Sequence, residues 1–406
     1  MLKRNVKIFI CAAVVMAVFG VYVAKQIPAD MYFTQGSRLE IKSLPMVTLK
    51  AKNHGSSSQV NSAGQKLVYT ANLFGVIPLK EVNVSTQGAR VVSVAGTPFG
   101  IKMFSDGVMV VGFSDVQTTT GYQCPARLSG IQMGDVIVSI NGKQTKSNDD
   151  VENIILLSGE NPLSVKLLRD GKEHTVVLVP VMDISLGSYR TGMWVRDSSA
   201  GVGTMTFYDV QKGMFAGLGH GIKDTDTQKD IRLLSGEIVP VKIMGLTKSE
   251  NGQAGELKGT FTSDFATGKI LANSTNGVYG TIFTVPDDNM MEVASPQEIV
   301  PGAATILTTL NGTQPREFGI VIEKIALTTS DQNKNMIIRI SDPELLSLTG
   351  GIVQGMSGSP IIQNGKLVGA VTHVFVNQVE RGYAVFAQNM VQSMDNAAKV
   401  CLENAG

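Results

Sequence analysis

The N-terminal segment constrains this chain most, because it commits the rest of the protein to export. Basic residues at positions 3, 4 and 7 precede an apolar stretch from Ile8 to Ala24. A positive flank followed by an apolar run directs a chain into a membrane. The run is short for a spanning helix and long for a signal-peptide core. Because Tyr22 and Val23 crowd the cleavage position, we expect residues 1–25 to remain as an uncleaved membrane anchor, with a cleaved signal as the alternative.

The exported part has the composition of folded, strand-rich domains. The chain has 406 residues, of which 43% are hydrophobic, enough for two or three cores. Its 43 glycines suit turns, and runs of Val, Ile and Thr suit strands, so the expected fold is mostly β. A net charge of +1 favours protein partners and no nucleic acid. Outside the anchor only Cys124 and Cys401 remain, too few for a disulfide framework.

Residues 26–89 are assigned to a spacer and N-terminal region. Between positions 26 and 65 the sequence shows no clear periodicity, and its centre from His54 to Ser58 is polar. Such a composition is typical of a flexible spacer or loop. We therefore expect no chemistry from His54.

Residues 90–182 have the pattern of a separate small domain. The segment from Gly134 to Lys143 is an alternating strand that ends in Asn-Gly, a strong hairpin signal. A helix capped at positions 148–149 follows, and two strands joined at Asp170-Gly171 complete the unit. This order of elements, with the motif G-D-x-I-x-x-I-N-G, resembles a PDZ domain of the type found in exported bacterial proteases.

The PDZ resemblance implies a peptide-binding groove. In that family a loop before an edge strand presents N–H groups to a carboxylate, and the peptide pairs as an added strand. We assign the loop to Pro98, Phe99, Gly100 and Ile101, and we expect a peptide C-terminus or an internal segment as ligand. The alternative is that Phe99 and Ile101 are core residues.

The sharpest chemical signal is the glycine-rich segment 350–362. A serine hydroxyl attacks a carbonyl when a tight turn exposes it and N–H groups face the developing oxyanion. Glycines at positions 355 and 358 flank Ser357 and permit such a turn. We predict Ser357 as nucleophile and the N–H groups of Gly355 and Ser357 as the oxyanion hole. The alternatives are Ser359 as nucleophile, or a turn without chemistry.

This loop resembles the nucleophile loop of trypsin-like peptidases but departs from it twice. Met356 stands where an acidic residue usually precedes the serine, and Ser359 stands where a second glycine follows. The acid that pairs with a newly freed N-terminus is therefore absent. Activation by such a terminus is not expected, which agrees with a chain tethered at its N-terminal end.

Four histidines are candidates for the general base. His54 lies in the spacer and His174 in a polar hairpin, where exposure is expected. His220 follows an apolar strand in a glycine-rich turn, which can present the ring to a cleft. His373 alternates with apolar residues and is more typical of a packed or pocket-lining strand residue. We predict His220 as the base, and ligand spacing for zinc is absent, so no metal or cofactor is expected.

The third member of such a site is a carboxylate that fixes the imidazole tautomer. Two candidates remain open from the residues alone. Asp264 lies downstream of the histidine at a distance like that in trypsin-like chains, whereas Asp342 precedes Ser357 by fifteen positions. Each could instead form a turn, and Asp342 precedes a proline, as turn and N-cap residues often do.

The chain as a whole resembles the SpoIVB-type sporulation peptidases of endospore-forming bacteria. The likeness rests on G-L-G-H-G-I around His220, T-G-G-I-V-Q-G-M-S-G-S-P-I-I around Ser357, and G-A-V-T-H-V-F-V-N after it. It covers a membrane segment, a PDZ domain and a serine peptidase domain. In that family the catalytic set is His, Asp and Ser in chain order, with the aspartate in a D-x-E-L-L context. The resemblance therefore selects Asp342 and leaves Asp264 as second choice.

The resemblance and the chain length predict the architecture. We expect a trypsin-like double β-barrel serine peptidase domain over residues 183–406, with two six-stranded barrels and the site between them. The PDZ domain is expected before the catalytic domain. This order argues against a quality-control protease of the high-temperature-requirement type, in which the PDZ domain follows.

The resemblance also implies a role. Family members are secreted across the forespore membrane into the intermembrane space. There they cleave a membrane-bound regulator and themselves, which triggers intramembrane processing of a mother-cell sigma factor precursor. We thus expect a regulatory, membrane-anchored serine endopeptidase with protein partners and autocleavage. The alternative is a catalytically inactive, membrane-tethered PDZ scaffold, which the intact His, Asp and Ser set disfavours.

Overall fold

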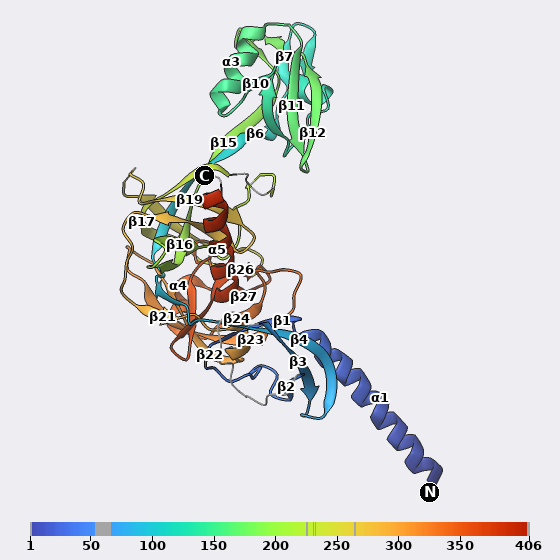
Figure 1. The fold of residues 1–406 in the computed structure, drawn as a ribbon. Coiled ribbons are helices and arrows are strands. Elements are labelled where there is room, and N and C mark those ends of the chain that lie inside the picture. The colour runs from blue at the N-terminus through green and yellow to red at the C-terminus, as the bar shows by residue number, and fades with distance from the viewer. Residues whose placement is uncertain are drawn as a thin grey trace.

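A computed structural model describes residues 2–52, 66–224, 226–229, 231, 233–263 and 265–403. Figure 1 shows an elongated molecule with a small domain at one end, a β-rich body in the middle, and a small sheet with a protruding helix at the other end. The predicted class, mostly β with an N-terminal apolar helix, is confirmed.

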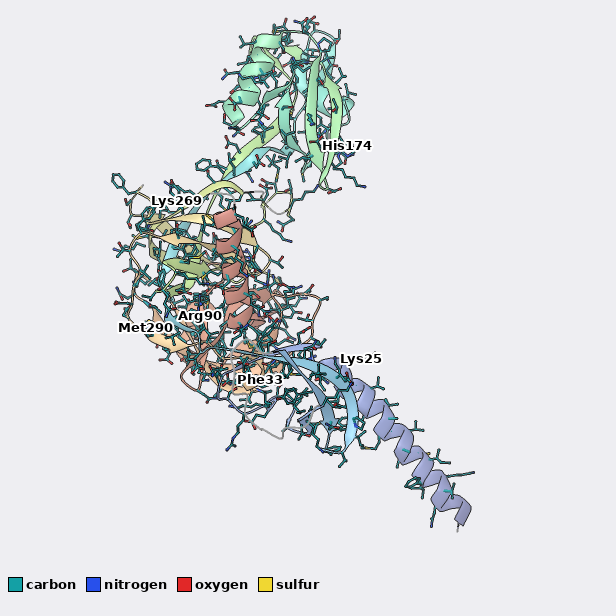
Figure 2. All side chains as sticks on the ribbon, viewed as in Figure 1. Lys25, Phe33, Arg90, His174, Lys269 and Met290 are labelled. Carbon is teal, nitrogen blue, oxygen red and sulfur yellow. The ribbon has the colours of Figure 1, made fainter. Side chains whose placement is uncertain are left out.

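The N-terminal helix and a small sheet form one folded unit. The helix α1 (Leu2–Gln26) leads into a sheet of strand order β1-β4-β3-β2. The strands are β1 (Asp30–Thr34), β2 (Val47–Ala51), β3 (Lys66–Leu73) and β4 (Ile77–Gln87). Val23 in the last turns of α1 and Ile27 just after the helix lie in the core of this sheet, and both are buried. Figure 2 labels Lys25 and Phe33 at this junction of helix and sheet.

The predicted flexible spacer is wrong for the described part of residues 26–65. Met31, Phe33 and Val47 lie in the buried core of the N-terminal sheet. The sequence shows no clear pattern there because β1 and β2 are only five residues long. Their pairing partners, β3 and β4, come from beyond position 65. His54 and its polar neighbours lie outside the described residues.

The first barrel is a ring of six strands within the described residues. The pairings run β6-β17-β19-β20-β16-β15 and close through β15 with β6. The strands are β6 (Pro98–Phe113), β15 (Met193–Asp209), β16 (Met214–Gly217), β17 (Leu233–Thr247), β19 (Gly268–Ser274) and β20 (Gly277–Ile282). Three shorter strands extend from the ring, namely β5 (Val91–Val94), β18 (Glu256–Phe261) and β21 (Met290–Glu292). A six-stranded first barrel is therefore present, but the predicted range 183–406 is wrong for it, because its strand β6 comes from residues 98–113.

The second barrel is closed by six further strands of the described chain. They are β22 (Gly302–Thr308), β23 (Arg316–Ile325), β24 (Met336–Ile340), β25 (Pro360–Gln363), β26 (Lys366–Phe375) and β27 (Gln378–Phe386). A short helix η1 (Pro296–Glu298) precedes the barrel, and α4 (Pro343–Thr349) follows β24. The final helix α5 (Ala387–Glu403) contacts strands of both barrels and holds them together.

The PDZ unit is inserted into the first barrel. Its elements are β7 (Val116–Thr118), β8 (Gly121–Gln123), α2 (Pro125–Leu128), β9 (Val136–Ile140), β10 (Lys143–Gln144), α3 (Asn148–Ser158), β11 (Leu163–Arg169), β12 (Lys172–Leu178), β13 (Val181–Asp183) and β14 (Ser188–Arg190). The long strands β6 and β15 run from the barrel into this unit and pair along their length (Figure 1). The unit therefore begins and ends later in the chain than the predicted range 90–182. His174 is exposed on β12, as expected (Figure 2).

The assignment of Pro98, Phe99, Gly100 and Ile101 to the PDZ loop is wrong. This segment begins β6 inside the first barrel, where it pairs with β15 on one edge and β17 on the other. No edge is left there for a peptide. Phe99 and Ile101 are each 4% exposed and lie in the barrel core, so the alternative was correct. A Cβ on Gly100 would lie 2.6 Å from the ring of Phe261, so only glycine fits.

Candidate active site

The predicted nucleophile loop connects α4 to β25 and is folded against the core of the second barrel. Met356 is completely buried, and the N–H of Gly358 donates to the carbonyl of Val371 at 2.8 Å. Gly355 and Gly358 have φ angles of +96° and +95°, which glycine adopts without strain. The two glycines therefore fix the backbone on both sides of Ser357.

Strand β15 of the first barrel holds the same loop from the other side. The N–H of Thr204 donates to the carbonyl of Ser357 at 3.1 Å, and its hydroxyl donates to the carbonyl of Gly355 at 2.7 Å. The hydroxyl of Thr206 donates to the carbonyl of Gly358 at 2.8 Å. Both threonines are buried, so these bonds do not compete with water. The loop is thus positioned by both barrels.

Two backbone donors of the loop are available to a ligand. Within the described chain, the N–H groups of Gly355 and Ser357 have no protein acceptor. The N–H of Met356 between them is used, donating to the carbonyl of Val353 at 3.2 Å. An oxyanion hole requires unpaired donors next to the nucleophile. The predicted oxyanion pair stays a prediction, and this alternation supports it.

The hydroxyl of Ser357 lies beside the strand that carries the second histidine. Its Oγ is half-buried and donates to the carbonyl of Thr372 at 2.7 Å. Thr372 immediately precedes His373 on β26. The oxygen that would attack is therefore held at the surface of the second barrel, facing the first.

His220 reaches this position from the first barrel. Leu218 and Gly219, just after β16, have φ angles of +68° and +69°, which turn the chain sharply. A Cβ on Gly219 would lie 3.0 Å from the Thr372 methyl group. A Cβ on Gly358 would lie 2.6 Å from the Leu218 nitrogen. These close approaches place the His220 turn against the nucleophile loop, and glycine at both positions permits them.

The ring of His220 is held as a neutral base. Its Nδ1 lies 2.8 Å from the carbonyl oxygen of Gly221, a hydrogen bond that requires the Nδ1–H tautomer and leaves Nε2 as an acceptor. Burial lowers the pKa of His220 below its ordinary value, and the charge of Lys223 acts in the same direction. The Gly221 carbonyl opposes this shift. A neutral ring with a free Nε2 is what a general base requires.

His373 is a second ring in the site, although the sequence favoured a packed strand residue. It is exposed on β26, and its ring centroid lies 4.8 Å from that of His220. Desolvation, followed by the charges of His220, Lys334 and Lys223, lowers the pKa of His373. Two adjacent rings disfavour a double positive charge, so both are neutral near pH 7. Among the described residues, no group of three or more His, Cys, Asp or Glu side chains could hold a metal ion.

The structure does not bring Asp342 to the histidines. Its carboxylate caps α4, accepting from the N–H of Leu345 at 3.0 Å and of Gly319 at 3.4 Å. The Leu345 bond is the main cause that lowers the pKa of Asp342. Val374, next to His373 on β26, pairs with Gly382 of β27, and Gly382 pairs with Ile338 of β24. His373 therefore lies two strands from β24, and Asp342 follows Ile338 by four residues. Standard strand dimensions give roughly 15 Å between the Cα atoms of His373 and Asp342. The assignment of Asp342 stays a prediction from the resemblance.

Two alternatives from the sequence remain to be placed, Asp264 and Ser359. Asp264 lies outside the described residues. Ser359 is 0% exposed, and its Oγ has no hydrogen-bond partner in the described part of the chain. A hydroxyl buried in this way cannot meet a peptide carbonyl, so Ser359 does not fit the role of nucleophile.

Asn273 supports the His220 turn and was not singled out from the sequence. Its Oδ1 accepts from the N–H of Ile222 at 2.7 Å, and its Nδ2 donates to the carbonyls of Ile222 and Ile231. These bonds tie the turn after His220 to strand β19. Only the short polar stretch 273–276 at the end of an apolar strand could have drawn attention to it.

A second candidate site is a groove in the PDZ unit, with a volume of about 400 Å³. It lies between α3 and the start of β15 and is lined by Val151, Ile155, Met193 and Val195, among others. In the described structure, this part of β15 pairs only with β6, so its second edge is free. Gly192, with φ +76°, forms the preceding turn. The sequence missed this groove because its strand lies past the predicted end of the domain at 182.

Parts of the chain are similar to known protein families and to known proteins. Residues 187–391 match the SpoIVB peptidase S55 family, and residues 119–169 match a PDZ domain. The putative zinc metalloprotease BH06270 of Bartonella henselae is 34% identical over 56 residues, covering 14% of this chain and 16% of that protein. The zinc metalloprotease RasP of Geobacillus kaustophilus is 24% identical over 169 residues, covering 34% and 40%. The chain thus spans less than half the length of these relatives.

Two solved structures show weak overall similarity. The PDZ domain of the SdrC-like protein from Listeria monocytogenes is 20% identical, covers 22% of this chain and 87% of that chain, and gives a TM-score of 0.19. The HtrA-type protease AlgW with decapeptide is 10% identical, covers 50% and 55%, and gives a TM-score of 0.30.

The S55 match spans half of the chain and includes both barrels' contributions to the site. His220, Asp342 and Ser357 all fall within it. The chain belongs to the SpoIVB peptidase S55 family.

Proposed function

We propose that this peptidase cleaves internal peptide bonds with Ser357 as nucleophile and His220 as general base. One observation carries the proposal. Residues from two different barrels meet at Thr372, whose carbonyl accepts from the Ser357 hydroxyl and whose methyl group lies against the His220 turn. Two N–H groups without a described acceptor lie in the same loop.

The geometry suggests the order of events. The Ser357 hydroxyl turns from the Thr372 carbonyl toward Nε2 of His220, which takes its proton as Oγ bonds to the substrate carbonyl carbon. The substrate oxygen becomes negative and accepts from the N–H groups of Gly355 and Ser357. The imidazolium then protonates the leaving amine, and water hydrolyses the acyl-enzyme by the same route. Throughout, the Gly221 carbonyl keeps the proton on Nδ1.

The third member of the site is proposed to be Asp342, acting through α4. The helix capped by Asp342 begins the segment that leads directly to the nucleophile loop. Loss of the cap would loosen that segment and displace Ser357 and the oxyanion donors. In this proposal Asp342 is a positioning residue, and the Gly221 carbonyl orients the base.

The biological role that we propose follows the family resemblance. The enzyme acts as a regulatory protease in endospore formation, anchored with its folded part in the forespore intermembrane space. It cleaves a membrane-bound regulator and itself, and so triggers intramembrane processing of a sigma factor precursor. The groove between α3 and β15 binds a peptide C-terminus or an internal segment.

The structure supports retention of the anchor. The segment Asn5–Gln26 is long and apolar enough to cross a membrane. Val23, at the end of this segment, is buried in the core of the N-terminal sheet, and Gly20 packs on Leu79. Cleavage near Ala24 would remove these contacts, which favours an uncleaved anchor over a removed signal.

Covalent labelling tests the nucleophile. Full-length protein in detergent, treated with a fluorophosphonate, is expected to carry the label on Ser357 and to fragment itself. Ser357→Ala should do neither, whereas Ser359→Ala, which alters a buried hydroxyl, should still be labelled. Mass spectrometry of the peptides reads the result. A folded wild-type protein that stays unlabelled with membrane present would favour the PDZ scaffold.

Cap-preserving substitutions test Asp342. Asparagine and serine cap helices about as well as aspartate but carry no charge, whereas alanine costs about 1 kcal/mol of helix stability. We expect Asp342→Asn and Asp342→Ser to keep most of the kcat, and Asp342→Ala to lose more. The kcat and the midpoint of thermal unfolding are measured for all three. If Asn abolishes activity while its thermal midpoint equals that of wild type, the charge itself is needed and the cap interpretation fails.

Removing one anchor of the nucleophile loop tests the contact between barrels. Thr204→Val leaves the buried Gly355 carbonyl without its donor, which costs about 1–3 kcal/mol. Because this carbonyl belongs to the loop with the oxyanion donors, kcat should fall roughly 10-fold or more with KM nearly unchanged. Thr204→Ser retains the hydroxyl and should restore kcat. A proportional rise in KM with constant kcat would contradict the assignment.

The acid limb of the pH profile tests the state of His220. Because burial lowers its pKa, the ring stays neutral and competent below the ordinary value of about 6.5. The acid limb of kcat/KM should therefore have its midpoint below 6.5. Stability should also decline as pH falls below about 6.5, because the unfolded chain then binds protons first. A kcat/KM midpoint at or above 6.5 would show that the ring is not desolvated.

A further inference from the structure

The turn between β3 and β4 exposes an apolar surface that the peptidase site does not use. Phe74, Gly75, Val76 and Ile77, named here the apolar tip, close this hairpin. Phe74 is 57% exposed and Val76 is 74% exposed, whereas the core of the same sheet is well packed. Apolar side chains gathered at the end of a hairpin indicate a partner outside the domain.

The backbone of the tip favours a different residue from the one present. The N–H of Val76 donates to the carbonyl of Leu73 at 3.2 Å, which closes a turn with Phe74 and Gly75 at its centre. Their φ angles are +49° and +76°, so the turn is of type I′. Asparagine, aspartate and glycine are the residues that suit its first central position. A phenylalanine placed there with an exposed ring is unfavourable for folding and gains little packing in return.

The hairpin lies alongside the membrane helix. A Cβ on Gly20 of α1 would lie 3.5 Å from the Leu79 side chain, and Lys80 donates to the carbonyl of Ile27 at 2.6 Å. Along β4, Leu79 therefore lies nearer to the N-terminus of α1 than Lys80 does. The apolar tip precedes Leu79, so it lies farther in the same direction. Figure 1 shows the β3–β4 hairpin extending beside the end of α1 that joins the sheet.

The level of the apolar tip along α1 corresponds to a defined depth in a bilayer. Gly20 is four residues inside the end of the apolar run at Ala24, about 6 Å along a helix axis. A tip at or beyond the level of Gly20 lies at the boundary of headgroups and acyl chains, which interfacial elements occupy at about 5–10 Å. A bilayer that surrounds α1 up to Ala24 therefore reaches the level of the tip.

The charge next to the tip suits the same environment. The exposed Lys50 donates through Nζ to the carbonyl of Gly75 at 2.6 Å. Its long apolar stem can lie in the interface while the ammonium group meets anionic headgroups. Backbone groups of the hairpin are paired within the sheet, which lowers the cost of entering the interface.

We propose that the apolar tip inserts into the lipid bilayer around α1 and forms a second membrane contact of the enzyme. The proposal rests on the proposed uncleaved anchor. One helix alone allows the folded part to tilt and rotate, whereas a helix and a tip together fix the orientation of the N-terminal sheet. Because Thr328 of the second barrel donates to the Lys25 carbonyl, the barrels follow that orientation.

Depth-dependent quenching tests the proposal on the full chain. Cys11 and Cys401 are replaced by serine, and the buried Cys124 is kept. Val76→Cys is labelled with an environment-sensitive fluorophore and reconstituted in vesicles of phosphatidylethanolamine and phosphatidylglycerol. Lipids with a nitroxide near the headgroup end of the acyl chain should quench most of its emission. Val177→Cys, at a valine that is 63% exposed on the PDZ strand β12, is the matched control and should not be quenched.

The outcomes separate the tip from the anchor. A label at Cys11 in the background that keeps this cysteine reports the helix, and the intact mass reports cleavage. Quenching at Cys11 without quenching at Val76 overturns the tip proposal and leaves the anchor intact. An unquenched Cys11 label or a cleaved chain overturns the anchor. Blue-shifted emission at Val76 without lipid quenching shows a protein neighbour, such as a second copy, and also overturns the tip proposal.

Phe74→Asn separates insertion from folding. Asparagine suits the left-handed turn, so the thermal midpoint in detergent should not fall. The label at Val76 should nevertheless lose quenching, because the aromatic ring no longer anchors the tip. A lower thermal midpoint with unchanged quenching would show that Phe74 serves the fold and not the membrane.

Discussion

The candidate active site depends on the hydrogen bonds from β15 to the nucleophile loop. Thr204 and Thr206 hold the carbonyls of three loop residues, and the loop lies in the other barrel. With those carbonyls occupied, the N–H groups of Gly355 and Ser357 are left for a substrate. The barrels therefore assemble the site only in their docked state, in which α5 packs on both. Neither barrel alone contains the nucleophile, the base and the fixed loop together.

The same strand also reaches the groove of the PDZ unit, because that unit is inserted into the first barrel. The first residues of β15 line the groove, and Thr204, farther along, holds the Ser357 carbonyl. Between them the strand pairs continuously with β6 apart from two register shifts. A peptide added to the free edge of β15 would thus bind to the strand that positions the loop. This continuous strand is a physical connection between the two sites.

Local chemistry was predictable from the sequence, and long-range pairing was not. The turn around Ser357 requires glycines at 355 and 358, and only residues within the turn decide this. The segment at Phe99 was misassigned because its partners, β15 and β17, lie more than a hundred residues later. The capping role of Asp342 was visible in its following proline, yet its separation from His373 depends on barrel register. The groove of the PDZ unit was missed because one of its walls is the start of β15, which lies beyond the predicted end of the domain at residue 182.

With α1 in the membrane, as proposed, its fusion with the N-terminal sheet relates the position of the membrane to that of the barrels. Val23 and Ile27 belong to the core of that sheet, so the helix cannot swing freely where it leaves the apolar run. The N-terminal sheet is in turn tied to the second barrel. The backbone N–H of Lys42 donates to the Gln297 carbonyl, and Leu327 packs against the core of the sheet. A rigid path from helix to barrel restricts which substrate segments can reach Ser357. For the proposed membrane-anchored endopeptidase, height above the membrane would then select substrates together with their sequence.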